Sequence, residues 1–387
     1  MAYQDMPWQK GSSHSFDKLL ALSLPPLKNK TLLDVGCNTG YFCGWAHFQG
    51  ALRVRGVDSN AMFIEQARAW FPECSFTCAD WSELGTGTYD VVLCLSAIHY
   101  AADQAQFIDT LMSKVGPDGM LVLELGVAEG ESDEFVPVER RVTATQTDTR
   151  LFPTMARVAA MLDKYSFKYM GPSVMQAGDS TRRHVYHVYH KRPYAVLLLD
   201  RHYSGKSSVS NALFRPEIFK IFGESVYHGI ADGAVEAPEE LRRHIVYVEG
   251  TRHMQPPRIT ADICKAGLLR ELAAVFLKLA GKRDFILEHY VPPQFHMELA
   301  SALDEAGFFV VDVATLAGQK LPWTTLRLPY SQYTAYLTHL EALSGIDEEA
   351  YMAANPDIAE AVRRGEVPSA RFHYWHHGKR EKRPLKP

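Results

Sequence analysis

The sequence LLDVGCNTG at residues 32–40 decides the fold of the N-terminal half. It begins as a short, mostly apolar run, which is typical of a buried strand, and two glycines follow before the next helical pattern. Gly36 allows a tight turn. Gly40 lets the following helix pack closely and brings backbone N–H groups toward a ligand. The stretch therefore predicts a strand, a glycine loop and a helix that together form a ligand site.

Strands and helices alternate on both sides of this loop. The predicted strands are Thr31–Val35, Arg53–Val57, Tyr89–Leu95 and Met120–Leu125, and the helices between them include Ala61–Trp70 and Gln104–Val115. The residues from Gly116 to Gly119 indicate a turn before the fourth of these strands. Such alternation predicts an α/β fold, a mostly parallel sheet covered by helices.

Two carboxylates follow the loop at strand ends. Asp58 ends the second predicted strand, where a carboxylate can accept hydrogen bonds from both hydroxyls of a ribose. Asp80, followed by Trp81, comes after a third short strand. This order resembles the class I S-adenosylmethionine-dependent methyltransferases over about residues 27–190. The resemblance implies a Rossmann-like fold and S-adenosylmethionine as the cofactor; a related fold that has lost its ligand is the alternative.

The resemblance also implies which residues hold the donor. The methionine end would lie at the glycine loop, the ribose at the end of the second strand and the adenine beside the third. The expected donor set is Asp34, Gly36, Cys37, Asn38, Gly40, Asp58, Ser59, Asp80, Trp81 and Leu95.

The acceptor side is less defined by the sequence. Methyl transfer depends mostly on positioning, and a general base helps only where the acceptor holds a proton. His99 follows the fourth strand at the edge of the sheet where ligands bind, so it is a candidate base or positioning residue. A histidine packed in the pocket wall is the alternative. Glu124, at the end of the next strand, is a weaker candidate.

A second α/β domain is predicted for residues 191–330, after a junction at residues 190–193. It begins with the apolar strand Ala195–Leu199 and a polar glycine loop. Its later elements are Ile245–Glu249, a helix over Ala266–Ala280, the strand Asp284–Glu288, a helix over Gln294–Ala306 and the strand Phe308–Val313.

The glycine loop of this domain matches most of a phosphate-binding loop. That motif is Gly, four residues, then Gly-Lys-Ser/Thr, and residues 205–207 supply its second half, whereas Asp200 stands where the first glycine belongs. The region loosely resembles the P-loop kinases of small molecules and sugars over about residues 193–315. A loop for a sulfonucleotide and an idle loop are the alternatives.

The P-loop resemblance implies ATP and Mg²⁺ as ligands of this domain. Lys206 would neutralise the phosphates and Ser207 would reach Mg²⁺. Glu288, at the end of an apolar strand, suits the Mg²⁺ site as well, and Asp232 is a candidate base on the acceptor side. The expected nucleotide set is Gly205, Lys206, Ser207 and Ser208, with Lys206, Asp232 and Glu288 as catalytic candidates alongside His99.

Residues 331–387 are predicted to be helical. The segment from Ile346 to Glu381 resembles a small helical module of bacterial surface-polysaccharide enzymes, although Lys382 replaces its usual final glycine. Its aromatic residues either stack on sugars or form the core of a very small unit.

Composition and the resemblances together predict a function. The net charge of -4 gives no overall attraction to nucleic acid, and no apolar run is long enough to span a bilayer. We therefore expect a cytoplasmic enzyme, or one held peripherally at the inner membrane or in a glycan-assembly complex, with a glycan or phosphosugar acceptor and no nucleic-acid partner. The predicted activity is methyl transfer and ATP-dependent phosphorylation that cap a surface glycan such as O-antigen. The alternatives are an O-methyltransferase of sugars or natural products with a non-catalytic second domain, and a scaffold protein.

Overall fold

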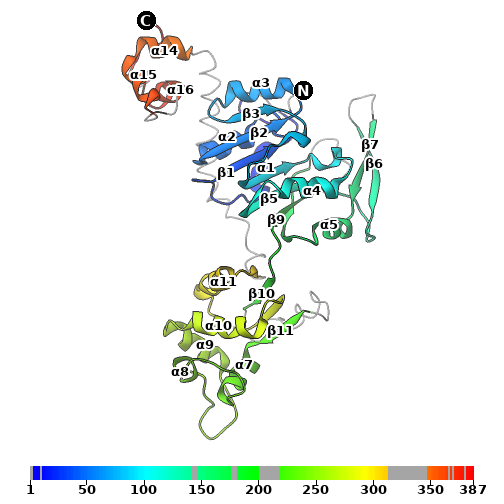
Figure 1. Cartoon of the computed structure of the whole chain (residues 1–387), viewed down its shortest axis with the longest axis vertical. Helices are drawn as coiled ribbons and strands as arrows, with labels where there is room; N and C mark the ends of the chain where they lie inside the picture. Colours follow the sequence, from blue (N-terminus) through cyan, green and yellow to red (C-terminus); the bar gives the residue numbers. More distant parts are fainter. Residues whose placement is uncertain are drawn as a thin grey trace. The chain divides into compact units, whose positions relative to one another are not determined.

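The computed structural model describes residues 3–8, 11–141, 147–175, 181–199, 218–312, 347–364, 367, 370–378 and 381–387 (Figure 1). Residue contacts divide the chain into two compact units. Unit 1 comprises Met1–His190 with Leu321–Pro387, and unit 2 comprises Lys191–Lys320. The predicted boundary at residue 330 lies outside the described residues.

Unit 1 contains a seven-stranded sheet in the order β3-β2-β1-β4-β5-β9-β8. The strands are β1 Thr31–Val35, β2 Arg53–Asp58, β3 Ser75–Cys78, β4 Tyr89–Leu95, β5 Val115–Val127, β8 Ser166–Pro172 and β9 Arg182–Tyr189. The strands from β3 to β5 in this order are parallel, while β9 and β8 are antiparallel to their neighbours. The predicted Rossmann-like fold is confirmed for this half of the chain.

Helices α2, α3 and α4 follow the parallel strands β1, β2 and β4, as the alternating pattern predicts, while α1 precedes β1 and α5 follows β7 (Figure 1). They are α1 Ser15–Leu22, α2 Tyr41–Phe48, α3 Ala61–Trp70, α4 Gln104–Met112 and α5 Met155–Leu162. Asn60 caps α3 by accepting hydrogen bonds from the N–H groups of Met62 and Phe63, and Asp103 caps α4 in the same way. A separate antiparallel hairpin, β6 Phe135–Arg141 and β7 Thr147–Pro153, lies beside the main sheet.

Two details of the predicted elements are wrong. The helix predicted over Gln104–Val115 ends at Met112, because Val115 already belongs to β5. The expected turn at residues 116–119 is an irregularity inside β5, where the pairing with β4 shifts between Tyr89 and Val91. Extra residues in one strand of a ladder are accommodated as a bulge, so the Gly-Pro-Asp-Gly sequence does not end the strand.

Gly44 in α2 supplies a direct test of the packing in unit 1. A Cβ at this position would lie 2.2 Å from Cε1 of the buried Phe71 ring. Alanine normally stabilises a helix interior relative to glycine, but here we expect Gly44→Ala to lower the free energy of unfolding by roughly 1–3 kcal/mol through overpacking. Urea unfolding followed by tryptophan fluorescence measures this, because all six tryptophans lie outside unit 2. Combining the change with Phe71→Leu should recover part of the loss.

Unit 2 contains a parallel four-stranded sheet in the order β11-β12-β10-β13. Its strands are β10 Tyr194–Leu198, β11 Phe219–Phe222, β12 Phe285–Glu288 and β13 Phe309–Asp312. Its helices are α7 Gly223–Ala231, α8 Glu239–Arg242, α9 Pro256–Lys265, α10 Leu269–Ala280 and α11 His296–Glu305.

Two expectations for unit 2 need correction. The run Ile245–Glu249 forms neither strand nor helix, because Val246 and Val248 point their side chains into solvent and the chain turns back through a bond from Val248 N to His253 O. The helix expected over residues 266–280 starts at Leu269, because Gly267 takes a left-handed conformation and separates α10 from α9. The sequence pattern did not predict this break.

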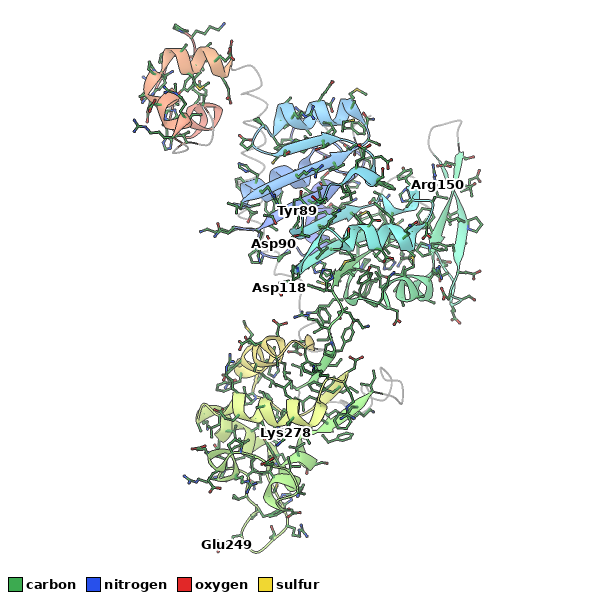
Figure 2. All side chains as sticks on the ribbon, viewed as in Figure 1. Tyr89, Asp90, Asp118, Arg150, Glu249 and Lys278 are labelled. Atoms are coloured by element: carbon green, nitrogen blue, oxygen red, sulfur yellow. The ribbon has the colours of Figure 1, made fainter. Side chains whose placement is uncertain are left out.

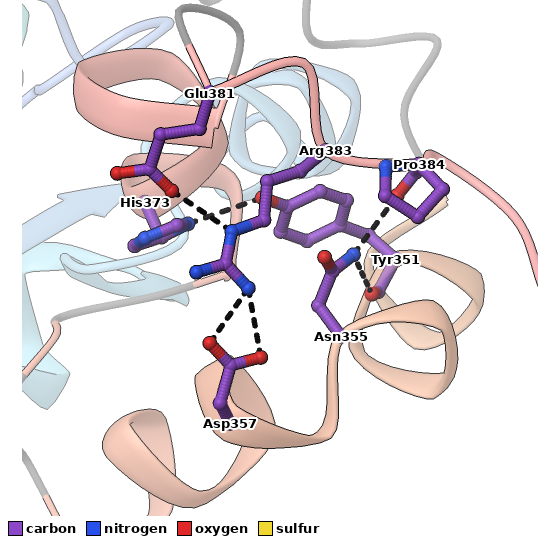
Figure 3. Close-up of polar contacts among 7 residues, drawn as sticks. All are labelled: Tyr351, Asn355, Asp357, His373, Glu381, Arg383 and Pro384. Carbon is purple, nitrogen blue, oxygen red and sulfur yellow. Dashed lines mark hydrogen bonds and ion pairs between the residues drawn. The ribbon is translucent and has the colours of Figure 1, made fainter.

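The C-terminal segment forms a small helical group, with α14 Glu348–Ala354, α15 Pro356–Arg363, α16 Ala370–His373 and a π-helical turn over Tyr374–Gly378. Figure 3 shows the polar contacts that hold it. The fully buried Tyr351 hydroxyl lies 3.1 Å from His373 Nδ1, Asn355 donates to the carbonyls of Tyr351 and Pro384, and Arg383 pairs with Asp357. Within the described ranges of the chain, none of the helices is both long and apolar enough to cross a bilayer.

Candidate active site

The glycine loop between β1 and α2 lies at the carboxyl edge of the sheet in unit 1. Gly36 and Gly40 have φ angles of 82° and 85°, and Asn38 between them has a φ of 50°. A Cβ on Gly40 would lie 2.9 Å from the Phe76 ring, so glycine is required there for close packing as well as for conformation. The loop therefore keeps the tight path that its sequence predicts.

Asp58 at the end of β2 fixes this loop. Its Oδ2 accepts a hydrogen bond from Asn38 N at 2.9 Å, and its Oδ1 accepts one from Asn60 N at 2.9 Å. One carboxylate thus joins the glycine loop to the start of α3. The side chain also faces a cavity, where it can accept further hydrogen bonds from a ligand.

The cavity has a volume of about 580 Å³, within the usual size range of small-molecule sites. Seven of the ten predicted donor residues line it: Gly36, Asn38, Asp58, Ser59, Asp80, Trp81 and Leu95. The other lining residues are Tyr3, Phe63, Ser96, Ala97, Tyr100 and Arg183. Carboxylates from two strand ends, an indole and a glycine loop meet here, which is a suitable set for a nucleoside joined to an amino-acid chain.

Trp81 and Asp80 form the end of the cavity at β3. The indole stacks on the Phe107 ring with centroids 4.3 Å apart and planes 21° apart. Asp80 caps the short helical turn that begins at Trp81 through a bond from Ser82 N at 3.1 Å. The indole is therefore held in one orientation and presents a flat apolar surface beside a carboxylate.

Three predicted donor residues lie behind the cavity wall. Cys37 and Asp34 are buried and Gly40 packs on Phe76, so none of them lines the cavity. Burial, together with the nearby negative charge of Asp58, raises the pKa of Asp34 to about 7. Asp34 contacts the Cys43 thiol at 3.8 Å.

The raised pKa of Asp34 predicts a pH effect on stability. Folded Asp34 holds its proton more tightly than the unfolded chain does, so the free energy of unfolding falls as the pH rises from about 4 to about 7. We expect Asp34→Asn to remove this fall. Above pH 7 its free energy of unfolding should exceed that of the wild type by up to about 4 kcal/mol. Urea unfolding of both proteins between pH 5 and pH 8, as approximate limits, tests this; parallel pH profiles would contradict it.

An N-terminal segment that the sequence did not single out completes the wall. Gln4 donates to Cys37 O at 3.2 Å, and its Oε1 accepts from Thr39 Oγ1 at 2.9 Å and from Tyr41 N at 3.1 Å. Gln4 thereby caps the first turn of α2 and places the neighbouring Tyr3 in the cavity lining. No local pattern near residue 4 could have predicted a contact so far along the chain.

The end of the cavity at β4 differs chemically from the donor end. Tyr100 and Arg183 line it, whereas the predicted base His99 lies behind it, buried, with its ring stacked on Phe152 at 5.4 Å. The structure thus places Tyr100 where the sequence suggested its neighbour. Arg183 is the second residue of β9, a strand that also carries Arg182, His184 and His187.

Glu124 lies under this end of the cavity in a buried ionic cluster. Its Oε2 lies 2.9 Å from Lys18 Nζ and 3.8 Å from Arg183 Nη1, the Ser96 hydroxyl donates to Oε2, and the Ser173 hydroxyl donates to Oε1. Burial alone would raise the pKa of Glu124, but Lys18, Arg183 and the two hydroxyls hold it below its ordinary value. Glu124 is therefore an internal counter-ion and does not reach the cavity.

The candidates in unit 2 are only partly within the described structure. Gly205, Lys206, Ser207 and Ser208, with Asp200, lie outside the described residues. Glu288 ends β12, is largely buried, and pairs in register with Leu198 of β10. Asp232 instead accepts a bond from Tyr247 at 2.8 Å and pairs with Arg252 at 2.7 Å.

Comparison with known proteins identifies the class. A family model described as a methyltransferase domain matches residues 33–123. A tRNA U34 carboxymethyltransferase of Pseudoalteromonas translucida is 28% identical over 184 residues, covering 42% of this chain and 56% of the relative. The protein of the same name from Idiomarina loihiensis is 27% identical over 174 residues, covering 42% and 50%. The structure of an S-adenosylmethionine-dependent methyltransferase from Mesorhizobium loti has a TM-score of 0.34 and 19% identity, covering 44% and 95%.

The N-terminal half is therefore a class I S-adenosylmethionine-dependent methyltransferase domain, as the glycine loop and its carboxylates predicted. The chain spans about half the length of the curated relatives it matches.

The predicted glycan-capping function is wrong, and so is the exclusion of a nucleic-acid partner. The curated relatives are named for a tRNA nucleoside and not for a glycan. The exclusion rested on the net charge of -4, but that number averages the whole surface, whereas recognition depends on the groups around one site. The shared glycan acceptor was inferred from two resemblances alone, and no residue of the site indicated it.

Proposed function

We propose that this protein transfers a methyl or substituted methyl group from an S-adenosylmethionine-type donor to a nucleoside of tRNA. The observation that supports it most is the similarity to enzymes named tRNA U34 carboxymethyltransferases, together with the methyltransferase-domain match over residues 33–123, which includes most of the cavity lining. The donor end of that cavity, with Asp58, Asp80 and Trp81, fits the ribose and adenine of such a donor.

When bound, the donor supplies an electrophilic carbon on a sulfonium. The residues of this chain do the rest by positioning. Asp58 orders the loop at one end, Trp81 would give the adenine a flat surface, and the buried residues Leu95 and Ala97 add apolar lining to the cavity. Holding donor and acceptor in line inside such a site is the main source of acceleration for a transfer of this kind.

A transfer assay tests the proposal. The full-length protein is incubated with donor labelled in the methyl group and with unmodified tRNA transcripts, and label in the precipitated RNA is counted. We expect label that ribonuclease treatment releases and that protease treatment leaves in place. Label that appears only with protein or carbohydrate acceptors would contradict the proposal.

For unit 2 we propose a site for the phosphates of a nucleotide with Mg²⁺, without assigning it a phosphotransfer reaction. Its support is topological: the strands that follow β10 and β12 in the chain, β11 and β13, lie at opposite ends of the sheet, so the strand order reverses between β10 and β12, and ligands bind at such a switch point. Glu288 stands at that edge, and the Gly-Lys-Ser sequence follows β10 in the chain. Calorimetric titration of Mg²⁺-ATP should show saturable binding that Lys206→Ala abolishes; heats that are the same for both proteins would contradict it.

A further inference from the structure

Tyr100 is a half-exposed aromatic residue that lines the cavity of unit 1. It ends the short helical turn Ile98–Tyr100, lines the cavity, and keeps 52% of its surface exposed. Covering a large aromatic side chain with another apolar surface is energetically favourable. A half-exposed ring at a cavity is therefore a surface on which a ligand can bind.

The Tyr100 ring is held in place before any ligand arrives. The Arg150 guanidinium lies 5.1 Å from its centroid and is itself fixed by Asp148, whose Oδ2 is 2.6 Å from Arg150 Nε. The ring of the neighbouring residue His99 lies with its centroid 4.2 Å from the Tyr100 centroid, and the His99 ring stacks on Phe152. A ring that is already ordered loses little conformational entropy when a second ring stacks on it.

The β6–β7 hairpin supplies these supports. Arg150 and Phe152 both belong to β7, and Gln104 at the start of α4 donates to the carbonyl of Leu151 between them at 2.8 Å. Figure 2 shows Arg150 on the side of unit 1 where this hairpin lies. The hairpin therefore joins the main sheet at the acceptor end of the cavity, and not at the donor end.

The groups around this end suit one shape of acceptor. The donor end is lined by Asp58 and Asp80, which carry carboxylates, whereas the other end is lined by Tyr100 and by Arg183. A ring face favours a flat partner, and guanidinium N–H groups donate to oxygens in the plane of such a partner. A nucleobase with carbonyl oxygens on its edge satisfies both.

We infer that Tyr100 is the stacking residue of the acceptor site, and that the acceptor is a single unpaired RNA base laid against this ring, with the β6–β7 hairpin as its support. The inference rests on the proposed function for the kind of polymer, and on the contacts of Tyr100 for the binding mode. Recognition of unpaired bases by stacking on aromatic side chains is the usual mode for single-stranded RNA.

Binding of a short uridylate RNA tests this separately from catalysis. Full-length protein saturated with S-adenosylhomocysteine is titrated against the fluorescent strand and against the same strand with its central base removed. We expect Tyr100→Ala to weaken binding of the intact strand by roughly tenfold to a hundredfold, with Tyr100→Phe within about threefold of the wild type. Tyr169→Ala is the matched control, since this tyrosine is 43% exposed on β8 and does not line the cavity. It should bind as the wild type does.

The outcomes separate the stacking site from the reaction. Equal binding of the intact and abasic strands, equal binding by wild type and Tyr100→Ala, or an equal loss in the Ala and Phe variants would overturn the stacking role. Unchanged affinity for S-adenosylhomocysteine in both variants shows that the donor end is intact. If the intact strand binds through Tyr100 but no tRNA accepts label, the proposed function fails and the stacking site stands.

Discussion

Replacing Asp58 with alanine is expected to weaken the binding of S-adenosylhomocysteine by roughly a hundredfold or more. The carboxylate accepts the N–H groups of Asn38 and Asn60, both at 2.9 Å, so its loss releases the glycine loop and the start of α3 together. Hydrogen bonds to a charged group contribute about 1.5–3 kcal/mol each, and any bonds to the ribose are lost as well.

Calorimetric titration of S-adenosylhomocysteine into the full-length protein measures this effect. Asp58→Asn keeps the shape but replaces one acceptor oxygen by a donor, so it should fall between wild type and alanine. The control is Asp118→Asn, which changes an exposed carboxylate on β5 away from the cavity lining. If Asp58→Ala bound the ligand within about threefold of the wild type, the donor would not lie where the lining places it.

Replacing Glu124 with alanine is expected to have the largest effect on stability. The change leaves the buried side chains of Lys18 and Arg183 without the carboxylate between them, and breaking a buried ion pair in this way costs about 3–5 kcal/mol. For a unit of this size the melting temperature should fall by roughly 6–20 °C. Ser96, whose φ is 59°, would also lose the carboxylate oxygen that accepts its hydroxyl.

A double variant separates the charge from the packing. Lys18→Met with Glu124→Gln removes one charge of each sign and keeps most of the volume, so we expect it to be clearly more stable than Glu124→Ala. Thermal unfolding followed by tryptophan fluorescence reports on unit 1, since unit 2 contains no tryptophan. A double variant as unstable as Glu124→Ala would show that the cluster stabilises through shape and not through charge pairing.

The sequence predicted the donor end of the site because its residues are local to strand ends. These residues end or follow parallel strands of the sheet, whose carboxyl ends meet at one edge: Gly36, Asn38, Asp58, Asp80 and Trp81. Their convergence follows from the alternation of strands and helices alone. The shift inside β5 was not predicted, because a Gly-Pro-Asp-Gly sequence is compatible with both a turn and a bulge.

The acceptor end could not be read in this way because its residues are not local. Tyr3 reaches the cavity only through Gln4, which bonds to the glycine loop more than thirty residues later. Arg183 comes from the antiparallel strand β9, and Tyr100 is oriented by the β6–β7 hairpin. These contacts depend on tertiary packing, so the sequence pointed to His99, the residue next to the one that lines the cavity.

The most direct test of the central claim is nucleoside analysis of tRNA after reaction. Unmodified tRNA transcripts are incubated with full-length protein and S-adenosylmethionine carrying a deuterated methyl group, digested to nucleosides and analysed by mass spectrometry, with Asp58→Ala as the inactive control. We predict one nucleoside that gains the heavy methyl group with the wild type and not with Asp58→Ala. Nucleosides of tRNA that stay unlabelled with a protein shown to bind S-adenosylhomocysteine would contradict methyl transfer from S-adenosylmethionine to tRNA.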